Sequence, residues 1–150
     1  MRLKLEKISE GFDEVIIRYR HMNATVQAVS QMVQASGEKI LASDDDGSQF
    51  ILVDTILYFE SIDGKNFAYT PNEVYQVNQT LKNLVYTYGK KGFFRSAKAM
   101  VLNIYHIANF KSHSFGRIEA TLDNGEKVLI SRKYALKLRQ LLEEGVRDED

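Results

Sequence analysis

Short runs of apolar and β-branched residues recur through the middle of the chain. Phe50 to Val53, Ile56 to Glu60 and Asn66 to Thr70 are such runs, each about five residues long. Asp63-Gly64 lies between the last two, and glycine readily supplies the positive φ that a tight hairpin turn requires. Further along, two more runs flank a second turn pair, Asn124-Gly125. The pattern predicts antiparallel strands joined by hairpins.

Two stretches change from strand-like to helical spacing. The first shows apolar residues on one helical face from Val77 to Tyr88, with Gly89 placed to end the helix. The second runs from Lys133 to Leu142 and carries its leucines on one side. We therefore predict an α+β fold, mainly antiparallel β, made of short strands with two helices and preceded by a small N-terminal α/β unit.

Residues 1–42 are predicted to form that N-terminal unit. Leu3, Leu5 and the run from Val15 to Ile17 favour strands, and apolar residues at helical spacing from Met22 to Val33 favour a helix. The Asp-rich residues 43–48 are expected to be a turn or linker, and residues 49–142 the main domain. Residues 143–150 form an acidic tail. The N-terminal unit is a candidate for self-association or for docking a regulator.

One stretch, from Phe93 to Asn103, combines features of a binding segment. It has two adjacent aromatic residues, then Arg95 and Lys98 among small residues, then an apolar run closed by Asn103. Small side chains would let the backbone approach a polyanion such as DNA closely. The alternative is an ordinary buried strand that carries two solvated cations.

The distribution of charge agrees with nucleic-acid binding. The formal net charge is zero, yet twelve Lys or Arg residues stand against three acids between Lys82 and Arg139. A basic block of this kind is the electrostatic footprint of a nucleic-acid binder. The chain has no cysteine and no phosphate-binding glycine loop, and we find no catalytic or metal-binding motif. We expect no enzyme activity, no cofactor and no metal. No signal peptide or membrane span is recognisable, so a cytoplasmic location is expected.

Four ordered motifs resemble the LytTR family of bacterial DNA-binding domains. They are Ile56 to Lys65, Phe93 to Asn103, Asn124-Gly125-Glu126 and Ile130 to Tyr134. The resemblance covers roughly residues 48–142. It implies an elongated β-fold that inserts loops into successive major grooves of double-stranded DNA, and therefore a sequence-specific transcriptional regulator.

Seven cations are candidates for DNA contact. The resemblance assigns Lys65, Lys98 and Arg132 to the three contact regions of the family. Charge alone adds Lys90, Lys91, Arg95 and Arg117 as residues that neutralise phosphates and set the register. Arg132 could instead pair with Glu119 or Glu126 and serve only to hold the last helix.

The sequence also departs from many relatives. Ala97 and Ala99 stand where polar residues are frequent in the family, and residues 1–42 are too few for a phosphoacceptor receiver domain. The chain is therefore more similar to stand-alone LytTR regulators, which implies a homodimer on repeated sites and a membrane protein that restrains it. The alternative function is a protein-interaction module on the same fold that has lost DNA binding.

Overall fold

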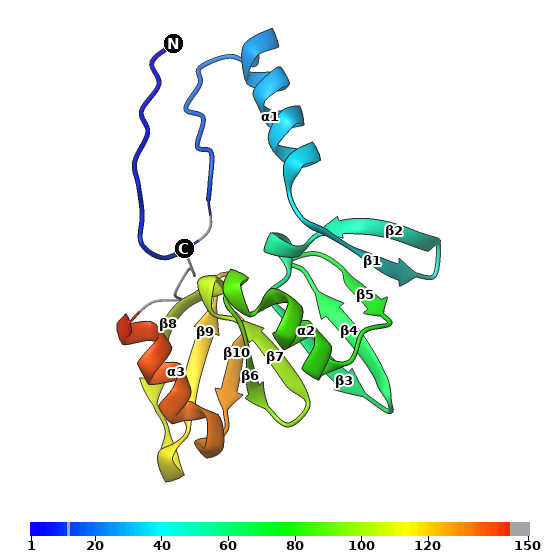
Figure 1. The fold of residues 1–150 in the computed structure, drawn as a ribbon, viewed down its shortest axis with the longest axis vertical. Helices are drawn as coiled ribbons and strands as arrows, with labels where there is room; N and C mark the ends of the chain where they lie inside the picture. The colour runs from blue at the N-terminus through cyan, green and yellow to red at the C-terminus, as the bar shows by residue number, and fades with distance from the viewer. Residues whose placement is uncertain (12, 145–150) are drawn as a thin grey trace.

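The structure is a computed structural model, and it describes every residue except residue 12 and residues 145–150. Two antiparallel sheets form the body of the described chain (Figure 1). The larger sheet has the strand order β2-β1-β5-β4-β3-β7-β6. Its strands are β1 Lys39–Asp44, β2 Gly47–Leu52, β3 Tyr58–Ile62, β4 Lys65–Tyr69, β5 Val74–Val77, β6 Phe93–Ala97 and β7 Met100–Asn103.

The smaller sheet has the strand order β10-β9-β8, with β8 Ile107–Ser112, β9 Ile118–Leu122 and β10 Lys127–Ile130. The helices are α1 Ala24–Ser36, α2 Leu81–Tyr88 and α3 Arg132–Glu144. Short 3-10 turns, η1 Val53–Thr55, η2 Gly89–Lys91, η3 Ile104–His106 and η4 Ser114–Gly116, link several of these elements. The predicted fold class, α+β with mainly antiparallel sheet, is confirmed.

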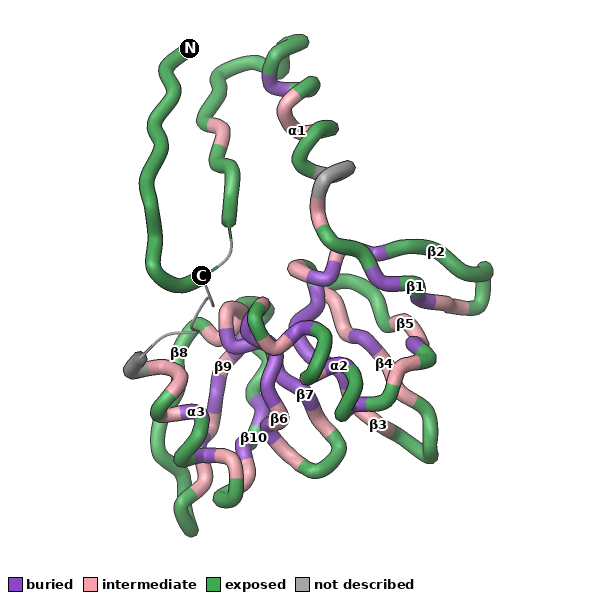
Figure 2. The backbone as a smooth tube through the Cα atoms, in the orientation of Figure 1, coloured by how far each residue is buried: buried purple, intermediate pink, exposed green. Residues whose placement is uncertain are grey.

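Each face of the large sheet supports its own hydrophobic core, because successive strand residues point to opposite faces. Phe59, Phe93 and Val101 face α2 and belong to one buried cluster. Their chain neighbours Tyr58, Phe94 and Leu102 face the other way, toward the small sheet and α3, and belong to a second cluster. Figure 2 shows buried residues concentrated along β3, β6, β7 and β9. The body is thus a layered domain with the large sheet in the middle.

A buried amide fixes the end of β7. Asn103 is fully buried, and its side-chain nitrogen donates to the Ile56 carbonyl oxygen at 3.1 Å. Its side-chain oxygen accepts from the Tyr105 backbone N–H at 3.1 Å. The buried Ile56 carbonyl oxygen thereby has a hydrogen-bond donor. The polar residue that closes the apolar run therefore has a structural purpose.

Both turn pairs predicted from the sequence form hairpins. Asp63 (φ 52°) and Gly64 (φ 80°) join β3 to β4, and Ile62 pairs with Lys65. Positive φ at both central residues is the turn type whose twist matches two antiparallel strands. Gly125 (φ 86°) lies in the turn between β9 and β10. These turns fix the register of their strands.

The helix boundaries follow from side-chain caps. The Asn23 side chain accepts from the Val26 backbone N–H at the start of α1. The Thr80 hydroxyl accepts from the Asn83 N–H at 3.1 Å and starts α2. The prediction that the helix begins at Val77 was wrong, because Val77 pairs with Asn66 and is the last residue of β5.

The predicted N-terminal strands are absent from the described residues, since 1–11 and 13–23 form neither helix nor strand. A strand needs a hydrogen-bonding neighbour, and none of the described strands pairs with this segment. Of the expected turn or linker at 43–48, the turn is present: Ser43 pairs with Ser48 across it. It is not a linker between units, because both flanking strands belong to the large sheet. Of the predicted acidic tail, residues 143 and 144 complete α3, and residues 145–150 lie outside the described part.

Candidate nucleic-acid interface

Backbone pairing gathers several loop tips at one end of the body, which we call the hairpin end. The Ser61 N–H of β3 donates to the Ala99 carbonyl in the β6–β7 turn at 2.8 Å, so two hairpin tips lie side by side. The Ser131 N–H donates to the Ser96 carbonyl at 3.1 Å and brings the start of α3 to the same place. In Figure 1 these tips and the β8–β9 loop all lie at the lower end.

The segment from Phe93 to Asn103 is a hairpin rather than a single strand. Lys98 and Ala99 form the exposed turn between β6 and β7. Arg95 lies on β6, and its Nε donates to the carbonyl oxygens of Ala97 (3.1 Å) and Lys98 (3.2 Å). A second guanidinium nitrogen also donates to the Lys98 carbonyl. Arg95 therefore braces the turn that presents Lys98.

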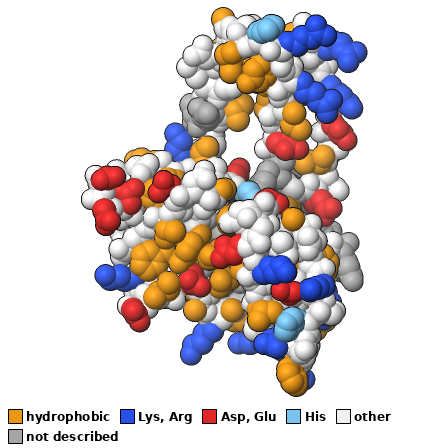
Figure 3. Space-filling view, turned by 180° about the vertical axis from the view of Figure 1, so that it is seen from behind, with side chains coloured by type: hydrophobic (Ala, Val, Ile, Leu, Met, Phe, Trp, Pro, Cys, Tyr) orange, Lys and Arg blue, Asp and Glu red, His pale blue; other side chains and the backbone are white. Residues whose placement is uncertain are grey.

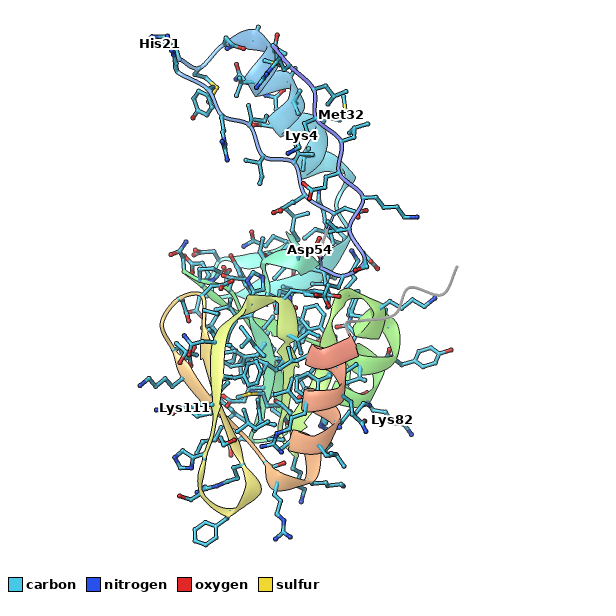
Figure 4. The ribbon with its side chains drawn as sticks, turned by 90° about the vertical axis from the view of Figure 1, so that its left-hand side faces the viewer. Lys4, His21, Met32, Asp54, Lys82 and Lys111 are labelled. Carbon is cyan, nitrogen blue, oxygen red and sulfur yellow. The ribbon has the colours of Figure 1, made fainter. Side chains whose placement is uncertain are left out.

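An open groove separates the two hairpin tips from the start of α2. Its volume is about 480 Å³, and its lining includes Arg95, Lys98 and Lys82 together with Gly64 and Thr80. Lys82 was not among the predicted site residues. Its place in the first turn of a helix, just after the Thr80 cap, gave no sign that it would lie beside the other cations. In Figure 4 its side chain projects outward from the body.

Lys65 and Arg132 stand on either side of Lys98 at the hairpin end. Lys65 follows the Asp63-Gly64 turn and is exposed, and Arg132 is the exposed first residue of α3. Among the described residues, no carboxylate forms an ion pair with Lys65, Lys98 or Arg132. Glu119 instead pairs with Lys111 at 3.3 Å. The alternative in which Glu119 or Glu126 holds Arg132 has no support in the geometry.

The β8–β9 loop contributes an exposed aromatic residue beside a cation. Phe115 is 84% exposed and has a left-handed backbone (φ 63°, ψ 34°), which is rare for a bulky side chain. The Arg117 guanidinium lies 5.8 Å from the centre of the Phe115 ring. A Cβ added to Gly116 would lie 3.2 Å from the Arg132 side chain, so this loop packs closely on the start of α3. No motif in the sequence indicated that Phe115 belongs to the candidate site.

Lys90 and Lys91 lie at the other end of β6, away from the hairpin end. Lys91 forms ion pairs with Asp54 (3.5 Å) and Glu38 (3.8 Å). Lys90 also has an interaction partner within the molecule. The structure therefore brings together Lys65, Arg95, Lys98, Arg117 and Arg132 of the predicted set, and separates these two lysines from them.

Two acidic side chains accept hydrogen bonds from tyrosines of the second core cluster. The Tyr58 hydroxyl donates to Glu126 at 2.7 Å, and the Tyr69 hydroxyl donates to Glu60 at 3.0 Å. The two rings stack with centroids 4.4 Å apart. Burial, followed by the hydrogen bond to Glu60, raises the pKa of Tyr69 to about 12. Burial and the bond to Glu126 also raise the pKa of Tyr58. The carboxylates of this cluster are used internally.

His106 has a structural position between three loops. Its Nε2 lies 2.6 Å from the Asp54 carbonyl oxygen, and its Nδ1 lies 2.9 Å from an Asp123 carboxylate oxygen. These contacts tie η3 to η1 and to the β9–β10 turn. The imidazole thus holds three loops together at the end of the body away from the hairpin tips.

A comparison with protein families decides which fold family this arrangement belongs to. The profile of the LytTr DNA-binding domain matches residues 46–143, which is most of the chain. The chain belongs to the LytTr DNA-binding domain family. This family is one of DNA-binding domains rather than enzymes, and its match begins in the β1–β2 turn and ends in α3. The resemblance seen in the sequence motifs is confirmed.

Individual relatives agree with this LytTr assignment. The chain is 26% identical over 145 residues to the sensory transduction protein LytT of Bacillus subtilis, covering 92% of this chain and 59% of the relative. It is 27% identical over 110 residues to LytT of Bacillus anthracis, covering 73% of this chain and 45% of the relative. The chain thus spans about half the length of these curated relatives.

A solved LytTr structure has the same fold. It is the LytTr DNA-binding domain of a methyl-accepting/DNA response regulator from Bacillus cereus, and it matches with a TM-score of 0.67 at 23% identity. The match covers 71% of this chain and 98% of that chain. Within the described part of the chain, no helix is both long and apolar enough to cross a membrane.

Proposed function

We propose that this protein is a sequence-specific, DNA-binding transcriptional regulator that contacts double-stranded DNA with its hairpin end. One observation carries the proposal: three loop tips and the start of a helix converge there and present cations. Lys65, Lys98 and Arg132 have no ion-pair partner among the described residues. The names of the LytT relatives, sensory transduction proteins, fit a regulatory purpose.

The tips fit DNA grooves by shape as well as by charge. Hairpin tips are narrow, and a B-DNA major groove about 12 Å wide accepts elements of the size of a two-stranded ribbon. Arg132 can pair bidentately with a guanine edge, whereas Lys65 and Lys98 act as mobile point charges. Lys82, Arg95 and Arg117 line the flanks and suit the phosphates that set register. We leave Lys90 and Lys91 out of the proposed contact set.

Phe115 belongs to the proposed interface. An apolar ring can contact the methyl group of thymine in the major groove. Its left-handed backbone costs free energy, and burial of the ring does not offset that cost because the ring is exposed. Such strain is typical of functional sites. The adjacent Arg117 would hold the ring beside the DNA backbone. The loop would therefore add an apolar contact next to the cationic ones.

Selection from a randomised duplex pool tests the proposal. The protein should enrich a defined sequence and bind it more tightly than a scrambled duplex at physiological salt. A variant with Lys65, Lys98 and Arg132 all changed to Ala should lose that preference while keeping its melting temperature, because all three side chains are exposed. A variant with Lys90, Lys91 and Lys127 changed to Ala removes the same three charges away from the hairpin end and controls for the lost charge.

Failure to enrich any sequence with folded protein would contradict the proposal. The same result would favour the alternative, a protein-interaction module on a LytTr fold. Equal loss of binding in both variants would show that total charge, rather than the hairpin end, governs the interaction.

A further inference from the structure

The large sheet has one outer edge that no described strand covers. β2 is the last strand of the sheet and pairs only with β1. Its sequence, Gly47 to Leu52, contains neither proline nor a charged residue, and these are the usual protections of an exposed edge. The opposite edge strand, β6, is approached by β10 and α3 through the Ser131–Ser96 hydrogen bond. The β2 edge is therefore open to a further strand.

Exposed apolar and acidic groups flank this edge. Leu41 and Phe50 are paired directly across β1 and β2 and are 47% and 67% exposed. They lie on the sheet face that, further along, is covered by the small sheet and α3. The end of β1 and the turn to β2 carry Asp44, Asp45 and Asp46. Figure 3 shows an apolar patch beside acidic side chains on this part of the molecule. A fitting partner is an extended segment with apolar residues and cations.

Residues 1–9, which we call the arm, have that chemistry. Leu3 and Leu5 are 84% and 85% exposed and alternate with Arg2 and Lys4, and Lys7 follows. The arm is extended but forms no strand. It is also loosely packed, because an open cavity of about 930 Å³ lies between it, residues 13–18 and α1. The alternating sequence of the arm therefore favours a β-strand, but no described strand of the same chain pairs with it.

We propose that residues 2–8 of one chain add as a strand to the outer edge of β2 in a second copy. Side chains of a strand alternate between faces, so Leu3 and Leu5 would share one face and extend the Leu41–Phe50 patch. Arg2 and Lys7 stand near the two ends of the added strand. Whichever direction the strand runs, one of them lies beside the acidic β1–β2 turn. The charges complement each other best with Arg2 beside that turn, because Glu6 adjoins Lys7 at the other end.

A second copy is favoured over the same chain as the source of the strand. In Figure 1 the arm and β2 lie on opposite sides of α1. The thirteen residues of α1 make a helix about 20 Å long between them. Exchange is also reciprocal: each arm covers the β2 edge of the other chain, so two copies form a closed, two-fold symmetric dimer. This inference does not depend on the proposed DNA binding.

Cysteine cross-linking tests the exchange, because the chain has no cysteine of its own. Lys4→Cys in one protein and Gln49→Cys in another place thiols on the arm and on β2 without removing a leucine. The two proteins, one labelled with ¹⁵N, are mixed and treated with a short bis-maleimide. We expect a covalent mixed dimer of about twice 17.2 kDa. Asn109→Cys on β8, the outer strand of the small sheet, replaces Gln49→Cys as the control and should give little product.

The double variant Lys4→Cys/Gln49→Cys distinguishes the sources of the strand. Cross-linking within single chains at high dilution, with no mixed dimer, would overturn the proposal in favour of the protein's own arm. Mixed product no greater than in the β8 control would overturn it as well. DNA binding can persist in either case, so these failures leave the proposed function intact.

Sedimentation provides a second test. The unmodified protein should form dimers that dissociate on dilution, whereas Leu3→Asp/Leu5→Asp should sediment as a monomer at every concentration. These two leucines are exposed, so the change does not threaten the folded body. A variant that dimerises as well as the unmodified protein, or an unmodified protein that stays monomeric, would contradict arm exchange.

Discussion

Lys98 and Lys91 can be compared directly, because they lie beyond the two opposite ends of β6 and carry the same charge. Lys98 stands in the exposed turn after β6, while Lys91 precedes β6 and pairs with Asp54 and Glu38. If Lys98 neutralises a phosphate, Lys98→Ala should make the log–log slope of affinity against salt shallower by about 0.9. Lys91→Ala should leave that slope unchanged.

The size of the affinity loss follows from the same slope. We take the two proteins to bind equally at about 1 M salt, where phosphate contacts contribute little. A difference of about 0.9 in slope then lowers the affinity of the variant by about 0.7 log units at about 0.15 M salt. That is roughly a fivefold weaker Kd, or about 1 kcal/mol. Lys91→Ala should instead lower the free energy of unfolding by about 0–1 kcal/mol, since it removes partly exposed ion pairs.

Fluorescence anisotropy of one labelled duplex, titrated at several salt concentrations, measures both slopes. Urea unfolding of each variant measures the stabilities. Equal changes in slope for the two variants would refute the assignment of the DNA contact to the hairpin end. So would a Lys98→Ala slope that matches the unmodified protein.

Three further changes test other parts of the structure. Asn103→Ala removes the side-chain donor to the buried Ile56 carbonyl and should lower the free energy of unfolding by about 1–3 kcal/mol, measured by urea unfolding. Phe115→Ala should weaken binding to a site with a contacted thymine but not to the same site with uracil, which lacks the methyl group; equal weakening on both would remove the methyl contact. Tyr69 has its pKa raised from 10.0 to about 12, so the fold favours the neutral phenol, and stability should fall as pH rises from about 10 to about 12. Tyr69→Phe should show a smaller fall in melting temperature across that range, and an unchanged fall would contradict the cause.

Much of the fold was predictable because local signals and tertiary structure agree. Asp63-Gly64 predicted a tight turn, and the helical spacing of apolar residues from Met22 to Val33 predicted α1. The start of α2 was misplaced because Val77 fits a helical stripe equally well. Only its pairing with β4, a contact distant in the sequence, makes it the end of a strand.

The N-terminal strands illustrate a different limit. Leu3 and Leu5 have the alternation of a strand, but backbone hydrogen bonds come from a neighbour that periodicity cannot supply. The turn at 43–48 was recognisable from its aspartates, whereas its membership in the large sheet depends on the pairing of β1 with β5. An alternating sequence can form a strand, but it does so only where the fold places another strand beside it.

The sequence predicted that the candidate site is cationic, but it did not predict every residue that belongs to the site. Turn chemistry placed Lys65 at a hairpin tip, and motif order placed Lys98 and Arg132. Charge alone added Lys91, which the fold commits to an ion pair with Asp54. Lys82 was missed because its position beside Lys98 arises from the packing of α2 on the sheet.

Protection of lysines from acetylation tests the central claim, that the hairpin end contacts DNA. The full chain is labelled briefly with and without the duplex that it selects, and the extent of modification at each lysine is measured by mass spectrometry. Lys65, Lys82 and Lys98 should be protected by DNA. Lys39 and Lys127, which are exposed near the opposite end, should react equally in both samples. Protection of Lys39 and Lys127 with continued reactivity of Lys65 and Lys98 would contradict the account.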